Sequence, residues 1–178
     1  MSHPELSEQE ILRRESLQKL RDLGIDPYPA ALYPVDAFAA DIKQNFEDGK
    51  QVCLAGRMLS QRIMGKASFA EIQDASGRIQ VYFNRDELCP GEDKTLYNEV
   101  FKKLLDLGDF IGIKGHVFKT QVGEISVHVT EFMLLSKSLR PLPLPKTDAA
   151  GVVHDAFTDP ELRYRQRYVD LVVNRQVK

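Results

Sequence analysis

The spacing of apolar residues along the chain changes its period near residue 50. Before that point apolar residues recur at intervals of three and four, which is the period of a helix. This spacing predicts a first helix that begins at a capping box of Ser7 and Glu10 and ends at Gly24, because glycine enters the left-handed conformation without strain. After a stretch that prolines keep extended, the same spacing predicts a short second helix over residues 35–46.

After residue 50 apolar and polar positions alternate, which is the period of a β-strand. Three strands, a helix and two further strands follow in the order of an OB-fold, a five-stranded Greek-key barrel. An SH3-like barrel lacks a helix at that place, and a split αβ sandwich needs two helices. We therefore predict an all-β core, an OB-fold barrel, preceded by N-terminal helices. The strands are expected over residues 51–58, 66–74, 78–84, 109–118 and 124–135, with a tight turn at 75–77 and the helix over 95–107, its apolar stripe formed by Leu96, Val100, Leu104 and Leu105.

The segment after the last strand has the composition of a linker. Prolines alternate with other residues over 139–145, which favours a stiff polyproline II conformation, and residues 146–158 are predicted to form a loop. Asp159 and Pro160 are typical of a helix start, and this helix is expected to run to Asn174. Because it stops close to the last residue, we expect a segment of a longer protein. The expected parts are a helical extension over 1–48, the OB-fold over 49–138, a proline-rich linker over 139–158 and the start of a further domain over 159–178.

Composition narrows the class of protein. With 43% hydrophobic and 28% charged residues, the chain has the profile of a soluble globular protein, and no apolar run approaches the roughly 20 residues that cross a bilayer. The net charge of −2 excludes a strongly basic coat for nucleic acid, so such a contact must come from a local patch. Cys53 and Cys89 are far apart and the histidines are dispersed, which predicts reduced thiols, a cytoplasmic location and no metal site.

The residues form no catalytic pattern. The chain contains no glycine-rich phosphate loop and no nucleophile elbow, and no pair of carboxylates is placed for proton transfer. The sequence therefore predicts a binding function, without catalytic residues and without a cofactor held by this chain.

One aromatic residue falls on a polar strand face. In the second predicted strand Phe69 lies on that face, and in the third strand Gln80 and Tyr82 point to the same side. In OB-folds the face of strands two and three is the usual oligonucleotide site. We interpret Phe69 as a platform on which a base stacks and Gln80 as the group that bonds the base edge. The alternative, in which Phe69 packs under a loop or a second domain, stays open.

Further polar side chains surround this face. Arg62 and Lys66, near the connection between the first two strands, offer cationic donors to base oxygens or phosphates. Glu124 offers an acceptor for a base N–H, and His128 of the fifth strand is expected to face outward, where it can stack or bond. Taken singly, Arg62, Lys66 and Glu124 are more typical of ordinary surface charges, and a structural surface histidine is an equal alternative for His128. The basic residues of the first helix form either a solvated face or a rod along a phosphate backbone; they are Arg13, Arg14, Lys19 and Arg21.

Several sequence blocks resemble bacterial class II lysyl-tRNA synthetases, and together they extend over nearly the whole chain. The blocks at residues 62–69 and 163–168 are specific to the lysine enzymes among their aspartate and asparagine relatives. The matching blocks are Gly56-Arg57-Met58, Arg62-Ile63-Met64-Gly65-Lys66-Ala67-Ser68-Phe69, Gln73-Asp74, Gly77-Arg78-Ile79-Gln80, residues 115–119, Gly123-Glu124, residues 139–143 and residues 163–171.

The resemblance implies an N-terminal anticodon-binding region that reads the U-rich anticodon of lysine tRNA. It implies stacking by Phe69, base reading by Gln80, and anticodon contacts from Arg62 and Glu124. Gln61 stands where several bacterial relatives have a second arginine, so no contact is carried over to it. The full-length enzyme would be a homodimer that attaches lysine to tRNA with ATP and Mg²⁺. Residues 159–178 would begin its class II catalytic domain, and this chain alone is expected to be inactive.

Three other functions remain open from the residues. A general single-stranded nucleic-acid-binding OB domain should carry aromatic residues on several strands, whereas Phe69 is the main outward one expected here, with Tyr82 a weaker candidate. A protein-interaction domain would dock a partner through the same face. A related aspartate- or asparagine-type synthetase would read a different anticodon.

Overall fold

The computed structural model describes residues 6–143, 146–147, 153–154, 157–174 and 177. The chain forms two compact units, Met1–Arg140 and Pro141–Lys178, and each is described by itself. None of the helices in the described ranges combines the length and the apolar character needed to cross a membrane.

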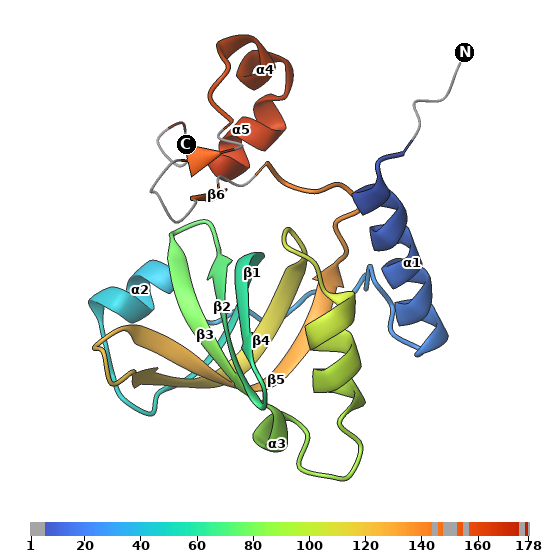
Figure 1. Ribbon diagram of the computed structural model, residues 1–178. Helices are drawn as coiled ribbons and strands as arrows, with labels where there is room; N and C mark the ends of the chain where they lie inside the picture. Colours follow the sequence, from blue (N-terminus) through green and yellow to red (C-terminus); the bar gives the residue numbers. More distant parts are fainter. Residues whose placement is uncertain (1–5, 144–145, 148–152, 155–156, 175–176, 178) are drawn as a thin grey trace. The chain divides into compact units, whose positions relative to one another are not determined.

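The larger unit contains a barrel of five strands, β1 (Gln51–Met64), β2 (Ala67–Gln73), β3 (Arg78–Asn84), β4 (Phe110–Lys119) and β5 (Ile125–Ser136). The sheet closes in the order β1-β2-β3-β5-β4, and only the β3–β5 pair is parallel (Figure 1). A short helix, α3 (Arg85–Leu88), and a π-helix, η1 (Leu96–Leu104), lie in the chain between β3 and β4. This order of elements confirms the predicted OB-fold.

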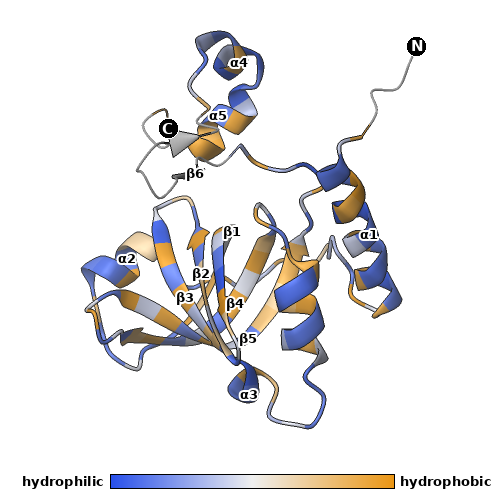
Figure 2. Ribbon diagram, viewed as in Figure 1, coloured by the Kyte–Doolittle hydropathy of each residue, from blue (hydrophilic) through white to orange (hydrophobic). Residues whose placement is uncertain are grey.

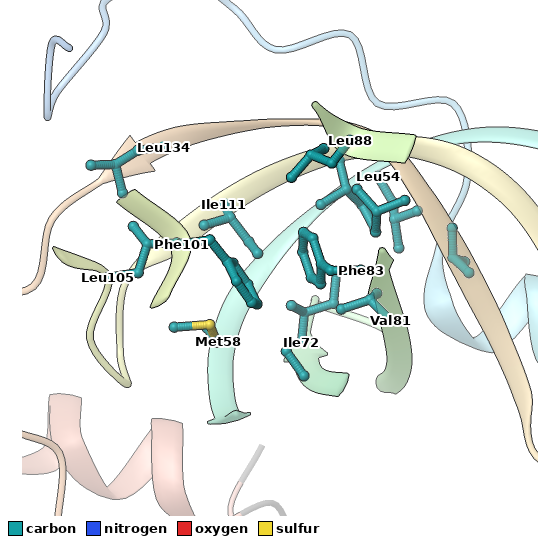
Figure 3. Close-up of a cluster of buried hydrophobic side chains, with 14 of the residues drawn as sticks. Leu54, Met58, Ile72, Val81, Phe83, Leu88, Phe101, Leu105, Ile111 and Leu134 are labelled. Carbon is teal, nitrogen blue, oxygen red and sulfur yellow. The ribbon is translucent and has the colours of Figure 1, made fainter. Parts of the chain in front are cut away.

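The core fills the barrel with alternate residues of each strand. Hydrophobic and hydrophilic positions follow one another along the strands (Figure 2). At the centre, the ring of Phe83 in β3 stacks on Phe101 of η1 with 4.1 Å between centroids, and both side chains are 0% exposed (Figure 3). Because η1 supplies this ring, the helix covers the barrel and contributes to its core.

The covering helix differs from the prediction in length and spacing. The sequence predicts residues 95–107, whereas η1 ends at Leu104, and Gly108, with a φ of 105°, lies in the turn before β4. A hydrogen bond of 3.0 Å from Leu105 N to Val100 O spans five residues, which is the wider spacing of a π-helix. The side chains buried by η1 are Tyr97, Val100, Phe101 and Leu104, of which the predicted stripe lacks Tyr97 and Phe101.

Strand β1 continues beyond its predicted end at Met58, and a bulge explains why the sequence pattern did not predict the continuation. The register with β2 shifts between Met58 and Ser60, so that Met58 and Leu59 are both buried. One extra residue reverses the phase of the alternation, which hides the remainder of the strand from a sequence pattern. Arg62 therefore lies within β1, and the connection to β2 is a tight turn at Gly65 and Lys66.

Two helices precede the barrel. The capping box of Ser7 and Glu10 opens α1 (Glu8–Asp22), and Gly24 follows its end with a φ of 76°, as predicted. The second helix, α2 (Ala39–Gln44), is shorter than the predicted residues 35–46. Its start is fixed by tertiary structure, because Ala39 N donates a 2.7 Å hydrogen bond to the carboxylate of Asp74, which follows β2.

The smaller unit contains two short helices where one is predicted. Asp159 caps α4 (Pro160–Arg165) by accepting a hydrogen bond from Leu162 N, as expected. The chain leaves the helical conformation at Gln166 and resumes in α5 (Arg167–Val173). In the predicted loop, β6 (Lys146–Thr147) pairs with β7 (Val153–His154). Within the predicted linker and loop, residues 144–145, 148–152 and 155–156 lie outside the described residues.

Candidate functional site

Two adjoining hollows open on the outer face of β1, β2 and β3. The larger has a volume of about 500 Å³ and the smaller about 370 Å³, and Arg62, Phe69 and Gln80 line both of them. We name the larger the polar hollow and the smaller the aromatic hollow after their remaining residues. These are Ser60, Gln61, Ala70, Glu71 and Glu124 in the polar hollow, and Tyr82, Phe118, Thr120, Gln121 and Val122 in the aromatic hollow.

Strand register places the shared side chains in one row. Arg62 pairs with Phe69 across β1 and β2, and Phe69 pairs with Tyr82 across β2 and β3. Because directly paired residues point to the same face of a sheet, all three project outward. The Arg62 guanidinium lies 5.6 Å from the centroid of the Phe69 ring, within the range of a cation–π contact. The bulge in β1 thus positions Arg62 beside the predicted stacking ring.

The aromatic hollow is lined by rings from three strands. The centroid of Tyr82 lies 5.0 Å from that of Phe69 and 6.0 Å from that of Phe118 in β4. Phe118 is not among the residues predicted for this face, although it follows the buried Val117 in an alternating strand and this pattern indicates an outward side chain. The expectation that Phe69 is the main outward aromatic residue is therefore wrong, because the outer face carries a continuous aromatic surface.

The carboxamide of Gln80 is held at one end. Its Oε1 accepts a 2.9 Å hydrogen bond from the hydroxyl of Ser126 in β5, and no described residue accepts a hydrogen bond from its Nε2. Alternation predicts that Ser126 faces outward, but its side chain, which lies between its register partners Gln80 and Phe118, is 0% exposed. The amide of Gln80 is thus anchored from below and keeps a free donor.

Glu124 lies at the end of the β4–β5 turn and joins the polar hollow to α2. One carboxylate oxygen is 3.1 Å from the ammonium of Lys43, and the two side chains are 47% and 40% exposed. An ion pair this exposed contributes little to stability. Within the described part of the chain the second oxygen has no partner, so Glu124 retains an acceptor at the rim of the hollow.

The structure does not bring Lys66 or His128 into either hollow. Lys66 lies in the β1–β2 turn with its ammonium 3.8 Å from Asp86. His128 packs against Tyr82, with 4.9 Å between centroids, and its Nε2 lies 2.9 Å from a carboxylate oxygen of Glu87, with an alignment that falls short of a hydrogen bond. Burial lowers the pKa of His128, opposed by the Glu87 carboxylate. His128 thus packs beside the rings of Tyr82 and Phe118 on the same face of the sheet.

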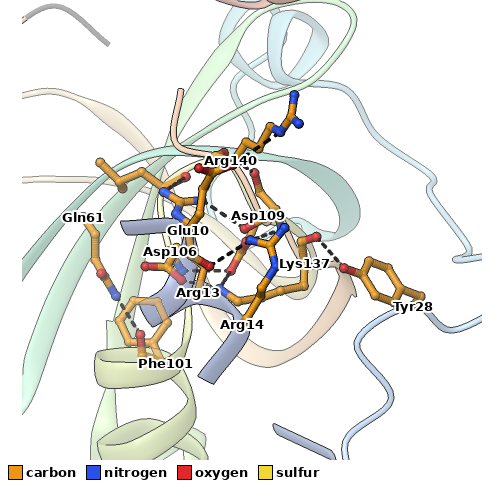
Figure 4. Close-up of polar contacts among 12 residues, drawn as sticks. Glu10, Arg13, Arg14, Tyr28, Gln61, Phe101, Asp106, Asp109, Lys137 and Arg140 are labelled. Atoms are coloured by element: carbon orange, nitrogen blue, oxygen red, sulfur yellow. Dashed lines mark hydrogen bonds and ion pairs between the residues drawn. The ribbon is translucent and has the colours of Figure 1, made fainter. Parts of the chain in front are cut away.

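Gln61 directs its amide toward the protein. Its Nε2 donates a 2.8 Å hydrogen bond to the carbonyl of Phe101 near the end of η1 (Figure 4). One N–H of this amide therefore holds β1 to the helix, and Gln61 forms part of the wall of the polar hollow.

A second polar group, the buried charge cluster, comprises Arg13, Asp106, Asp109 and Lys137 (Figure 4). Arg13 is only 5% exposed, and it donates to the carbonyls of Leu107 at 2.9 Å and Ser138 at 3.0 Å. This burial contradicts both sequence interpretations of Arg13, because the side chain is neither solvated nor free for a phosphate. Arg13 instead fastens α1 to the barrel.

The described residues contain no group of three or more histidine, cysteine, aspartate or glutamate side chains that could hold a metal ion. Cys53 and Cys89 are both buried and free.

Comparison with known proteins places these features in a family. The family described as "OB-fold nucleic acid binding domain" matches residues 52–135. Lysine–tRNA ligases of Christiangramia forsetii and Porphyromonas gingivalis are 66% and 64% identical to the chain, each over 98% of its length. The lysine–tRNA ligase of Azobacteroides pseudotrichonymphae is 59% identical over 97% of the chain. The chain spans only 31% to 35% of the length of these relatives. Over almost all of its residues, the chain is therefore similar to one part of these lysine–tRNA ligases.

Proposed function

We propose that the OB-fold of this chain recognises the anticodon of lysine tRNA, as the anticodon-binding part of a lysine–tRNA ligase. The observation that carries the proposal is the convergence of Arg62, Phe69, Gln80 and Glu124 on the polar hollow. This hollow lies on the face of an OB-fold that is generally used for oligonucleotides, and the β4–β5 turn beside it is also a usual contact. The names of the relatives support lysine tRNA as the ligand.

The groups in the polar hollow complement a uracil base. A base stacked on the Phe69 ring contributes about 1–3 kcal/mol whatever its identity, so selection must come from the base edge. Uracil presents carbonyl oxygens and an N3–H, which match the free Nε2 of Gln80 and the carboxylate of Glu124. Cytosine presents an amino group and an unprotonated N3 in the corresponding places. The amino group of cytosine would then face the Nε2 donor of Gln80, and its N3 acceptor would face the Glu124 carboxylate. Arg62 adds a positive charge for a phosphate or a base oxygen.

The activity of the longer protein is part of the proposal. It would attach lysine to tRNA with ATP and Mg²⁺, as a cytoplasmic homodimer. The described residues of this chain do not fit ATP and Mg²⁺, because they form no metal-binding cluster and no phosphate-binding loop, and catalysis would depend on other parts of the protein. We retain the division into a helical extension (1–48), the anticodon-binding domain (49–138), a linker (139–158) and the start of a class II catalytic domain (159–178).

The test is binding of anticodon stem-loops to the chain at one fixed salt concentration. We expect a UUU loop to bind more tightly than a loop whose middle U is replaced by C. Phe69→Ala should weaken binding of the UUU loop by about 1–3 kcal/mol. Phe110→Ala is a matched control, because Phe110 also carries an arginine over its ring, with Arg57 at 4.2 Å, but it lines neither hollow. Equal binding of both loops, unchanged by Phe69→Ala, would refute anticodon reading by this face.

A second function is favoured by the aromatic hollow. Rings from β2, β3 and β4 are the feature expected of a general single-strand-binding domain. The same experiment separates the two functions when a DNA oligonucleotide of thymidines is included. Binding of this DNA as tightly as the UUU loop, and equal weakening of both by Phe69→Ala, would favour the general function.

A further inference from the structure

The hydroxyl of Ser126 lies directly beneath the amide of Gln80. The two residues are register partners in the parallel pair of β3 and β5. Ser126 is 0% exposed, so its hydroxyl cannot reach a ligand and can act only through a neighbour. Its hydrogen bond to Gln80 Oε1 is 2.9 Å long. Because the two ends of a carboxamide are a donor and an acceptor, the end that is held inside decides which one faces outward.

The surroundings of Ser126 favour one orientation of this amide. If the amide were reversed, Nε2 would donate to the Ser126 oxygen and the hydroxyl would need another acceptor. The available one is the main-chain carbonyl of Glu124, at 3.4 Å, a long distance for a hydroxyl hydrogen bond. In the orientation of the structure the hydroxyl donates over the shorter distance, 2.9 Å to Gln80 Oε1, and no described residue accepts a hydrogen bond from Nε2.

We infer that Ser126 is a positioning residue that makes Gln80 a donor-only reader of the base edge. By holding Oε1, it presents the amide nitrogen to a carbonyl oxygen, as in uracil, and withholds the acceptor that an amino group, as in cytosine, would need. This inference rests on the proposed function, because it concerns how the same site selects its base. Ser126 itself touches no ligand. Its removal should therefore change the preference between bases more than the affinity.

The test compares UUU stem-loops with loops in which each U in turn is replaced by C, for four proteins. These are wild type, Ser126→Ala, Gln80→Ala and the double variant. We expect wild type to prefer U at one or more positions by about tenfold, the effect of about one hydrogen bond. Ser126→Ala should reduce that preference to about threefold or less while binding of the UUU loop changes by less than about threefold, because a freed amide can present either end. In the Gln80→Ala background, Ser126→Ala should have no further effect on preference.

Ser68→Ala provides a structural control. Ser68 is likewise a strand serine that is 0% exposed, and its hydroxyl lies 2.7 Å from that of Tyr97. It should lose a comparable buried hydrogen bond without changing base preference. An undiminished preference in Ser126→Ala, or equal weakening of all loops, would overturn the role of Ser126 while leaving anticodon reading intact. Absence of any preference in wild type would instead overturn the proposed function, and the inference with it.

Discussion

The buried charge cluster and the hollows on the outer face are built from similar side chains, yet these side chains are paired differently. In the cluster, Lys137 lies between two carboxylates and the terminal nitrogens of Arg13 donate to main-chain carbonyls. On the outer face, the Arg62 guanidinium contacts the Phe69 ring, and among the described residues it has no ion-pair partner. Polar groups paired inside the protein stabilise the fold, whereas groups left unpaired on a rigid strand face remain available to a ligand.

The exposure of a charged side chain determines whether its substitution mainly affects stability or mainly affects ligand binding. Lys137 and Asp109 are both 0% exposed, so removing the charge of Lys137 leaves the Asp109 carboxylate buried without its ion-pair partner. Arg62 is exposed, and water and salt screen its charge. A substitution in the cluster should therefore reduce stability without changing base preference, and a substitution at Arg62 should weaken RNA binding without reducing stability.

The largest effect is expected for Lys137→Met. Asp109 would lose an ion pair of 2.8 Å, and its buried carboxylate would remain without a compensating charge. We expect the free energy of unfolding to fall by about 3–5 kcal/mol, measured by urea denaturation. Protein that remains folded should keep the base preference of wild type.

The control for this substitution is Lys114→Met. Lys114 forms a pair of the same kind with Glu131 at 2.9 Å, but the two side chains are 48% and 68% exposed. Its loss should lower the free energy of unfolding by less than about 1 kcal/mol. Similar losses for Lys137→Met and Lys114→Met would show that burial does not determine how much an ion pair contributes to the free energy of unfolding.

Asp74 is intermediate in exposure between the buried cluster and the exposed ion pairs. Its half-buried carboxylate is hydrogen-bonded by the protein. It accepts hydrogen bonds from Ala39 N, Ser76 N and Gly77 N, and thereby joins the start of α2 to the β2–β3 turn. Burial alone raises the pKa of Asp74, but these hydrogen bonds lower it more, to below its usual value of 3.8. Since the folded pKa is lower than the unfolded one, this stabilisation is complete above the unfolded pKa and is lost as the pH falls through the folded pKa.

Asp74→Asn should therefore lower the free energy of unfolding at pH 7 by about 1–2 kcal/mol. The difference from wild type should shrink as the pH is lowered below 3.8, the ordinary pKa of the carboxyl. Urea denaturation at a series of pH values measures both effects. Glu124→Gln is the contrasting variant, because its ion pair is exposed and its removal should leave stability nearly unchanged. A constant difference between Asp74→Asn and wild type at all pH values would contradict this account of Asp74.

Features that depend on residues close in sequence could be predicted from the sequence, whereas features that depend on distant residues could not. Strand β3 begins and ends where alternation predicts, and the capping box of Ser7 and Glu10 forms as its spacing indicates. Both depend on residues close in sequence. The burial of Arg13 depends on carbonyls 94 and 125 residues away, and that of Ser126 on a partner 46 residues away. No local pattern contains such pairings.

Within the site, alternation could identify the outward face but not which side chains on it remain free. It placed Phe69 and Gln80 on one face, where the structure brings them together. The bulge after Met58 concealed that Arg62 belongs to a strand, and the aromatic surface became evident only when β4 was placed beside β5. Whether a charge is paired, as for Lys43 with Glu124, depends on the three-dimensional arrangement of α2 and the barrel.

The smallest expected effect is on the salt dependence of RNA binding, and it is tested by comparing substitutions at Arg62 and Lys66. Arg62 lines both hollows without an ion-pair partner among the described residues, whereas Lys66 lies outside them, 3.8 Å from Asp86. Each phosphate contact that is lost should reduce the slope of log affinity against log salt by about 0.7–1, measured for the UUU loop between about 50 and 200 mM salt. We expect this reduction for Arg62→Gln and a smaller one for Lys66→Gln, because Asp86 already compensates part of that charge. Equal reductions would mean that position in the hollow confers no advantage and that both residues act as ordinary surface charges. An unchanged slope with weaker binding for Arg62→Gln would mean that its guanidinium bonds a base and not a phosphate.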